Sequence, residues 1–309
     1  MEQPLTSIQE RIGSQLERIQ SPRVAKTLRM LENWVITLRR FRRNKLAVLG
    51  VLILLSLVFL AIFADIISPY DPILQLPGKA SLRPNPEHPL GTDNIGRDIL
   101  SRILHGGRIS LWVGGIAVFI SLSVGTLIGL VAGYNGGWLD SVLMRAMDIL
   151  MAFPSLLLAL LAVSVLGRSL DNAMIAVGLV YIPQYARLVR AEALKRRESV
   201  YVEAAKAIGA SPVRILFNEI LPNCLPPIIV YATMGIGTAI LDVAALSFLG
   251  MGALPPTPEW GLMIADAKRY FSNSPYQALM PGLAIFLIVV SFNLVGDGLR
   301  EALDPRLKR

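Results

Sequence analysis

Apolar and polar segments alternate along the chain, and this pattern gives the first indication of its class. The apolar stretches lie at about 46–67, 109–133, 146–166, 173–189, 226–250 and 279–298. Each is close to the roughly 20 residues that a helix needs to cross the hydrocarbon core of a bilayer. The pattern predicts an all-α, polytopic membrane protein with six transmembrane helices and both chain ends on one side.

Composition favours the same class. Of the 309 residues, 53% are hydrophobic and 17% are charged, a larger apolar share than soluble domains have. The first apolar run follows 45 polar residues and is too long for the core of a signal peptide, so we interpret it as a retained span. The predicted units are an amphipathic, basic N-terminal segment (1–45), the first span with an extracytoplasmic loop (46–108), a core of five spans (109–298) that includes the loop at 191–222, and a C-terminal tail (299–309). The loop at 68–108 is rich in proline and long for a simple connection, which indicates a cap.

Basic residues are distributed unevenly between the two sides of the predicted membrane. Of the 30 Lys and Arg residues, 22 lie on the side of the termini and 8 on the other side. Basic loops tend to remain in the cytoplasm, so both termini and the loop at 191–222 are predicted to be cytoplasmic. Topology therefore explains the formal charge of +8, and nucleic-acid binding is not indicated. The basic run at 39–45 is interpreted as a topology anchor that also attracts anionic lipid.

The loop at 191–222 has the pattern of two short helices joined by a tight turn. Four residues at spacing i, i+3, i+4 and i+7 share one face of the first helix: Tyr201, Ala204, Ala205 and Ile208. Gly209 is suited to end this helix. Ser211 is suited to the N-cap of a second helix, Pro212 to its first position, and the second helix is predicted to end at Pro222. The pattern indicates a docking surface for a soluble partner, with a surface helix that has no partner as the alternative.

Small residues recur at every fourth position of the second span: Ser121, Gly125, Gly129 and Gly133. They form a smooth strip on which another helix backbone can approach closely. The spacing leaves open whether that helix belongs to this chain or to another subunit. Three prolines inside other spans predict kinks: Pro154, Pro183 and Pro281.

Two aspartates lie within or near the ends of spans, where a charge is costly and therefore a functional candidate. Asp148 follows Arg145 by three residues, so we interpret it as half of an interfacial ion pair. Asp242 is deeper and is the better candidate for a translocation path. No metal site is predicted, because the two histidines and the single cysteine lack ligand spacing. The turn-rich segment at 88–102 predicts a fixed loop followed by a helix capped at Asp98 or nearby.

The loop at 201–222 resembles the EAA loop by which permease subunits of bacterial ABC importers seat in their ATPase. The match comprises Glu-Ala-Ala at 203–205, Gly209 four residues later and Leu-Pro at 221–222, although Glu219 stands where many of these loops carry Ile. The resemblance implies that coupling contacts with the ATPase are made by Glu203, Ala204, Ala205, Ile208, Gly209, Ser211, Pro212, Phe217, Leu221 and Pro222.

Further motifs are similar to one branch of these permeases, the second permease subunit of dipeptide, oligopeptide and nickel importers. They are Leu-Gly-Thr-Asp-x-x-Gly-Arg-Asp at 90–98, Leu-Ser-Phe-Leu-Gly at 246–250, Pro-Pro-Thr-Pro at 255–258 with Trp-Gly at 260–261, and strings at 292–300 and 303–306. The resemblance covers about residue 40 to the C-terminus. It implies the type I ABC importer permease fold in a bacterial cytoplasmic membrane. Asp242 departs from the pattern, because the family commonly has Glu at the position of Val243.

The resemblance implies a non-catalytic subunit that forms half of a translocation pathway for dipeptides, oligopeptides or related small solutes. The implied partners are a homologous second permease, two cytoplasmic ATPases and an extracytoplasmic substrate-binding protein. No cofactor is expected on this chain, and ATP and Mg would be used by the ATPases. The sequence has no Gly-x-x-x-x-Gly-Lys-Ser/Thr loop, so the motor must be another polypeptide.

Three other functions are compatible with the sequence. The chain could serve an importer of nickel or another small solute. It could be a secondary transporter in which Asp148 and Asp242 couple an ion gradient, although no repeat of broken helices is evident. It could also be a membrane scaffold with no transport path. Uptake into vesicles with and without ATP separates these classes.

Overall fold

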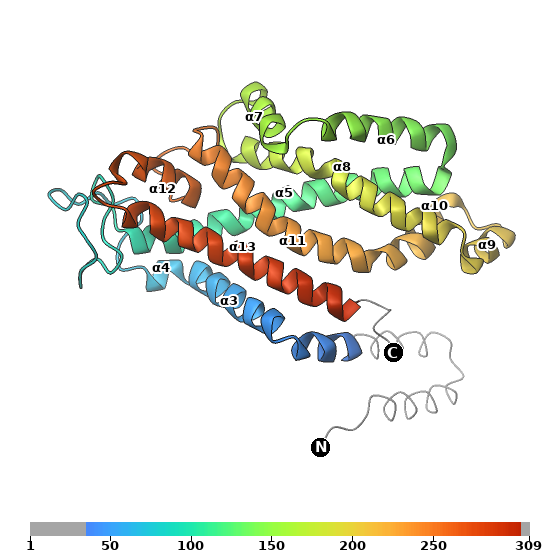
Figure 1. Cartoon of the computed structure of the whole chain (residues 1–309), viewed down its shortest axis with the longest axis horizontal. Helices are drawn as coiled ribbons and strands as arrows, with labels where there is room; N and C mark the ends of the chain where they lie inside the picture. Colours follow the sequence, from blue (N-terminus) through green and yellow to red (C-terminus); the bar gives the residue numbers. More distant parts are fainter. Residues whose placement is uncertain (1–34, 304–309) are drawn as a thin grey trace, which may run out of the picture.

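The computed structural model describes residues 35–303, and within them the chain is helical with no β-strand beyond an isolated bridge between Thr92 and Asp98. The helices form an elongated bundle, with the irregular segment before α5 at one end and α9 at the other (Figure 1). A short α-helix at 35–43 precedes them. The elements are α3 (Lys45–Ile62), α4 (Ala64–Ile67), α5 (Ile99–Asn135), α6 (Gly137–Met151), α7 (Ser155–Leu166), α8 (Leu170–Arg197), α9 (Val200–Ala207), α10 (Pro212–Arg214), the π-helical turn η1 (Ile215–Ile220), α11 (Leu221–Phe248), α12 (Trp260–Ala267), the 3₁₀ turn η2 (Lys268–Tyr270) and α13 (Tyr276–Leu303). The predicted all-α membrane fold is thereby confirmed.

The number of apolar spans differs from the six expected. Within the described residues, four helices are long and apolar enough to cross a membrane: α3, α5, the continuous helix from α10 through α11, and α13. A fifth crossing arises if α6 and α7 are counted as one bent span. The third expected span, 146–166, is in fact broken between Met151 and Ser155, and the two helices meet at 92°. Pro154 has the extended backbone of an N-cap and has no N–H, so it ends the helix rather than kinking it.

The fourth expected span, 173–189, lies inside α8. With 28 residues, α8 is long enough for a crossing, but its charged residues make it less apolar than the four spans. Its last turns carry Lys195, Arg196 and Arg197. Pro183 lies inside α8 and Pro281 inside α13, as predicted.

The small-residue strip of α5 packs against α8 of the same chain. A Cβ atom added at Gly129 would lie 2.5 Å from the carbonyl oxygen of Ala186, and one added at Gly133 would lie 2.7 Å from the Cβ of Ala193. The Ser121 hydroxyl donates to the carbonyl oxygen of Gly178 across the same contact, at 2.7 Å. The strip therefore lets two backbones come close together, and its partner is intramolecular.

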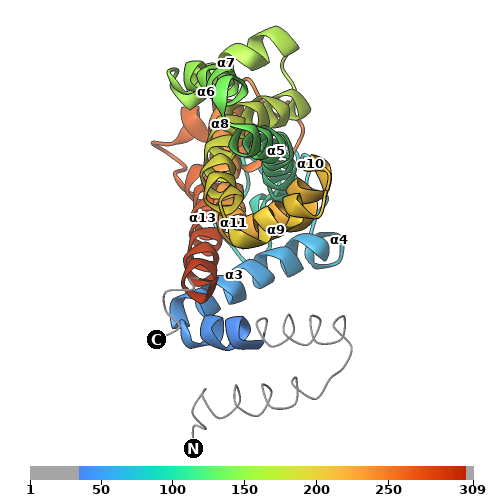
Figure 2. The same ribbon diagram turned by 90° about the vertical axis from the view of Figure 1, so that its right-hand side faces the viewer.

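The remaining helices surround this pair. Helix α11 packs on α5, α8 and α13, and α13 in turn packs on α3 and α12. Viewed along the bundle, α9 and α10 lie on the side of α5 that faces α3, while α6 and α7 lie on the side away from α3 (Figure 2). Helix α5 runs for 37 residues, from the irregular segment at one end of the bundle to α9 at the other.

Candidate functional site

The segment from Ser199 to Ile220 forms a helical hairpin at one end of the bundle. Helix α9 ends in a Schellman motif: the N–H of Gly209 donates to the carbonyl of Lys206 and the N–H of Ala210 to that of Ala205, both at 3.0 Å. Gly209 has φ +78°, a conformation that favours glycine. The Ser211 side chain then caps α10, which begins with Pro212. The predicted turn between two short helices is confirmed.

This hairpin has an inner face that the chain itself covers. Val202, Ile215 and Ile220 are fully buried in one apolar cluster with residues of α5, α8 and α11: Leu130, Val189, Ala193, Cys224 and Ile228. Ala205 and Leu221 are partly buried against the same cluster. The spacing had placed Ala205 on one exposed face of the first helix together with Ala204 and Ile208. In the structure Ala205 instead packs towards the buried cluster.

The outer face of the hairpin is apolar and uncovered. Ile208 and Val200 are each 81% exposed, Val213 is 65% exposed and Phe217 is 45% exposed. The hairpin and the turn after it also expose the other members of the predicted coupling set that are not buried: Glu203, Ala204, Gly209, Ser211, Pro212 and Pro222. Large apolar side chains gathered on one exposed surface mark an interaction site. We call this surface the outer face of the hairpin.

The second helix of the hairpin does not end at Pro222. Helix α10 continues through η1 into α11 without a break, and Pro222 occupies the first turn of α11. The π turn includes a hydrogen bond from the N–H of Leu221 to the carbonyl of Leu216, five residues earlier. A wider turn at this point accommodates a proline, which has no N–H to donate, without ending the helix.

Polar side chains link α8 to α11 inside the bundle. The Tyr181 hydroxyl donates to the carboxylate of Asp242 at 2.5 Å, and the Tyr231 hydroxyl donates to the Gln184 side chain. Tyr185 packs edge-on against Tyr231, with ring centroids 5.0 Å apart. Asp242 thus has a phenol partner at a helix interface, and the neighbouring Val243 is buried in apolar surroundings.

Asp148 does not pair with Arg145 as the sequence spacing suggested. Its carboxylate accepts from Arg187 of α8 at 2.5 Å. One turn further along the same contact, Arg190 makes a two-pronged bond to Asp140 of α6, at 2.5 and 2.6 Å. These two ion pairs fasten α6 to α8. The sequence carried no signal for either pair, because the partners lie on different helices.

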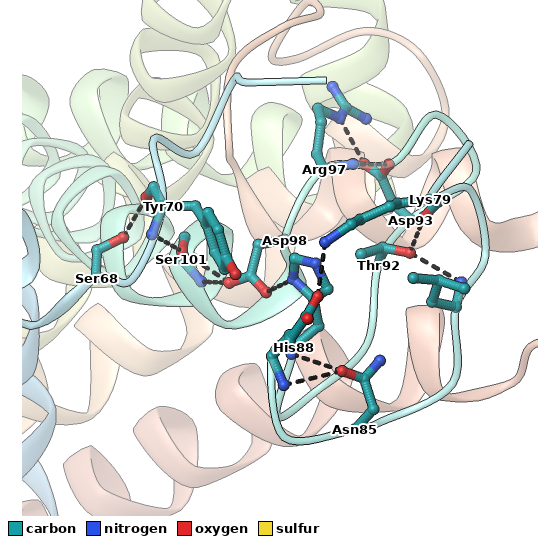
Figure 3. A network of polar contacts seen from close by, with 12 residues as sticks. Ser68, Tyr70, Lys79, Asn85, His88, Thr92, Asp93, Arg97, Asp98 and Ser101 are labelled. Atoms are coloured by element: carbon teal, nitrogen blue, oxygen red, sulfur yellow. Dashed lines mark hydrogen bonds and ion pairs between the residues drawn. The ribbon is translucent and has the colours of Figure 1, made fainter. Parts of the chain in front are cut away.

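The opposite end of the bundle is built on buried charged groups (Figure 3). The carboxylate of Asp98 caps α5 by accepting from the backbone and the hydroxyl of Ser101, and it also contacts Nδ1 of His88 at 2.9 Å. This confirms the predicted helix start. The carboxylate of Asp93 accepts from Arg97. The Arg97 guanidinium also lies 3.2 Å from the carboxylate of Asp266 in α12. Among the described residues, no group of three or more metal-ligating side chains lies together.

Arg102 fastens this irregular segment to a distant part of the chain. Its guanidinium donates to the carbonyl oxygens of Pro72, Pro256 and Thr257. Nearby, the indole N–H of Trp260 donates to the carbonyl of Ile103, and the hydroxyl of Tyr276 to that of Ser81. Glu259 caps α12 by accepting from the backbone N–H groups of Gly261 and Leu262. Burial raises the pKa of the Glu259 carboxyl, and these two hydrogen bonds oppose that shift.

Comparison with known proteins assigns this architecture to a family. Residues 125–309 match the family described as the inner membrane component of binding-protein-dependent transport systems, and residues 33–84 match the N-terminal transmembrane domain of oligopeptide transport permease C. The chain belongs to this family of transport permeases. The chain is 47% identical to the dipeptide transport system permease protein DppC of Alkalihalophilus pseudofirmus, over 89% of this chain and 90% of that one.

Other relatives of the permease carry related names. It is 48% identical to the glutathione transport system permease protein GsiD of Escherichia coli, over 87% of this chain and 89% of that one. It is 46% identical to a di/tripeptide transport system permease protein of Pseudomonas aeruginosa, over 87% of this chain and 90% of that one. A solved structure of the MetNI methionine ABC transporter in an inward-facing conformation has a chain with the same fold, at TM-score 0.55 and 19% identity, covering 66% of this chain and 97% of that one.

Proposed function

We propose that this permease forms half of the translocation pathway of an ATP-driven importer of dipeptides or oligopeptides. Relatives with 46–48% identity that are named for dipeptide, di/tripeptide and glutathione transport support a peptide substrate. A homologous second permease supplies the other half of the pathway, and an extracytoplasmic binding protein delivers the substrate. The chain itself is non-catalytic, and separate ATPase subunits use ATP and Mg.

The outer face of the hairpin carries this proposal. The inner face of the hairpin is anchored by fully buried Val202, Ile215 and Ile220, whereas Ile208 and Val213 are exposed on the outer face. An anchored element with uncovered apolar side chains is suited to occupy a groove of a soluble subunit. We propose that the ATPases bind here in the cytoplasm, and that closing of the ATPases moves the hairpin and switches the helices between two arrangements.

Uptake into vesicles tests the ATP requirement. Complexes reconstituted with both ATPases are supplied with the cognate binding protein and a labelled dipeptide, alanyl-alanine, with and without internal ATP. Uptake is expected only with ATP, and Asp242→Asn is expected to reduce it only modestly, because Asp242 already has Tyr181 as a partner. Uptake driven by an ion gradient without ATP, abolished by Asp242→Asn, would instead establish secondary transport.

Cysteine labelling tests the proposed orientation. In a Cys224→Ala background, a cysteine at Asn273 should react with an impermeant thiol reagent added outside, and a cysteine at Ala207 should not. Both positions are exposed, whereas the neighbouring Ser274 is buried and would not report. The reverse labelling pattern would place the hairpin outside the cell and rule out its contact with ATPases.

A further inference from the structure

The last turn of α5 contacts α9 through Tyr134 and Lys206, and it contacts the end of α8 through Arg197. The ammonium group of Lys206, in the last turn of α9, lies 5.6 Å from the centre of the Tyr134 ring. The guanidinium of Arg197, at the end of α8, donates to the backbone carbonyl of Tyr134 at 3.2 Å. A Cβ atom added at Gly136 would lie 2.7 Å from the same guanidinium, and Gly136 has φ +66°.

These contacts suit the C-terminus of a long helix. The last carbonyl groups of a helix have no partner within it, and the helix dipole makes this end negative. Arg197 supplies a hydrogen bond to one of these carbonyls, and Gly136 leaves room for its side chain. Lys206 adds a second positive charge at the same end, held over an aromatic ring by cation–π attraction.

We propose that Tyr134 is a positioning residue that joins the hairpin to α5, so that α9 and the end of α5 move as one body. This inference rests on the proposed coupling function. Helix α5 packs along α8 through its small-residue strip and extends to the buried Asp98 cap at the far end. The Tyr134 contact therefore gives a displacement of α9 a direct route into α5, a helix of 37 residues.

The test measures whether α9 and α5 keep a fixed distance during the nucleotide cycle. Spin labels are placed at Ala207 and Leu127, both exposed, in a Cys224→Ala background of the complete complex. Distance distributions are recorded by pulsed electron resonance without nucleotide and after trapping with ATP and vanadate. In the otherwise unchanged protein the two distributions are expected to coincide.

Variants of the contact should separate the two helices. Tyr134→Leu and Lys206→Met are each expected to increase the population of displaced distances about two- to fivefold, which corresponds to losing a cation–π contact of about 0.5–1 kcal/mol. Tyr134→Phe keeps the ring and should behave as the parent does. Lys195→Met is the matched control, since Lys195 is exposed at the same end and pairs with Glu192 of its own helix. The double variant Tyr134→Leu/Lys206→Met should have the same population of displaced distances as either single variant, because each change removes the same contact.

The outcomes distinguish this inference from the proposed function. If the ATPases co-purify normally and the distributions coincide in Tyr134→Leu as well, the positioning role of Tyr134 is wrong while coupling through the hairpin stands. A Tyr134→Phe effect as large as that of Tyr134→Leu would also overturn it, because the ring is then not the feature that matters. Failure of the parent permease to retain ATPases would count against the coupling function itself.

Discussion

The two ends of this bundle differ in which side chains they bury and which they expose. At one end, an irregular chain is fixed by charged and polar side chains that are buried almost completely, among them His88, Asp98, Arg97 and Arg102. At the other end, regular helices leave large apolar side chains exposed, with Ile208 at 81%. At the first end, Asp98, Arg97 and Arg102 are all bonded within the chain, while Nε2 of buried His88 has no hydrogen-bond partner among the described residues. The second is covered on one face only, which is the arrangement expected of a surface that another subunit completes.

We call the end that contains His88, Arg97, Asp98 and Arg102 the polar end. The largest effect on stability is expected there, from Asp98→Ala. This change removes the helix cap, worth about 0.5–2 kcal/mol. It also leaves His88 buried without its partner, at a cost of about 1–3 kcal/mol. The thermal unfolding temperature of the detergent-purified protein should fall by several degrees or more. Asp71→Ala is the control, because Asp71 only accepts a local bond from Ile73 in an exposed turn. Equal unfolding temperatures for both variants would show that the buried cap does not hold this end.

The helix pair that joins the two ends should respond next most strongly. Gly129→Ala places a Cβ atom 2.5 Å from the carbonyl oxygen of Ala186 and 2.8 Å from the Cβ of Val189. Forcing α5 and α8 apart is expected to cost about 1–3 kcal/mol of unfolding free energy. Gly115 is the matched site on the same helix, since an added Cβ meets nothing within 4 Å there. Gly115→Ala should be neutral or slightly stabilising, because alanine favours a helix over glycine. A Gly115→Ala variant as unstable as Gly129→Ala would contradict close packing as the reason for the small-residue strip.

A smaller effect on stability, with a larger effect on function, is expected at the hairpin turn. Gly209→Val forces a β-branched residue into φ +78°, a strain of about 1–3 kcal/mol confined to an exposed turn. The permease should still insert and unfold cooperatively, but it should retain less ATPase on purification. Glu203→Lys, which reverses a charge beside the outer face, is expected to weaken the same association with no loss of thermal stability. Normal ATPase retention in both variants would contradict the coupling assignment.

The smallest effect is expected from a salt bridge on the surface of the polar end. Lys79 and Glu87 lie 2.7 Å apart, and their hydrogen bond raises the pKa of Lys79 and lowers that of Glu87. Both groups are exposed to solvent, which screens such pairs. Lys79→Gln should leave the unfolding temperature unchanged. A clear decrease would show that the polar end depends on its surface charges as well as on its buried ones.

Features that depend on neighbouring residues in the chain could be predicted from the sequence. The Asp98 cap, the glycine turn at Gly209 and the Ser211 cap with Pro212 each follow from local backbone chemistry, and each is present. The face assigned to Ala205 was wrong because the inner cluster, which only the fold assembles, selects Val202 as its anchor. The partners of Asp148 and Asp140 were missed for the same reason: Arg187 and Arg190 come from α8.

The helix ends at prolines were the least predictable part of the fold. Pro154 separates two helices that meet at 92°, whereas Pro183 and Pro281 are accommodated inside helices. Pro222 was expected to end a helix but follows a π turn within a continuous one. A proline cannot donate a backbone hydrogen bond, and tertiary packing decides whether the helix continues around it. Sequence spacing alone does not contain that information.

The central claim is that the outer face of the hairpin binds the ATPases, and one co-purification measurement tests it most directly. Ile208→Asp places a charge at one of the two most exposed apolar positions of this face, and Ile73→Asp makes the same change on an exposed residue of the opposite end. Both variants should insert and unfold like the parent. Ile208→Asp is expected to lose most of the co-purifying ATPase, while Ile73→Asp retains it. Full ATPase retention by Ile208→Asp, or equal loss in both variants, would contradict the claim.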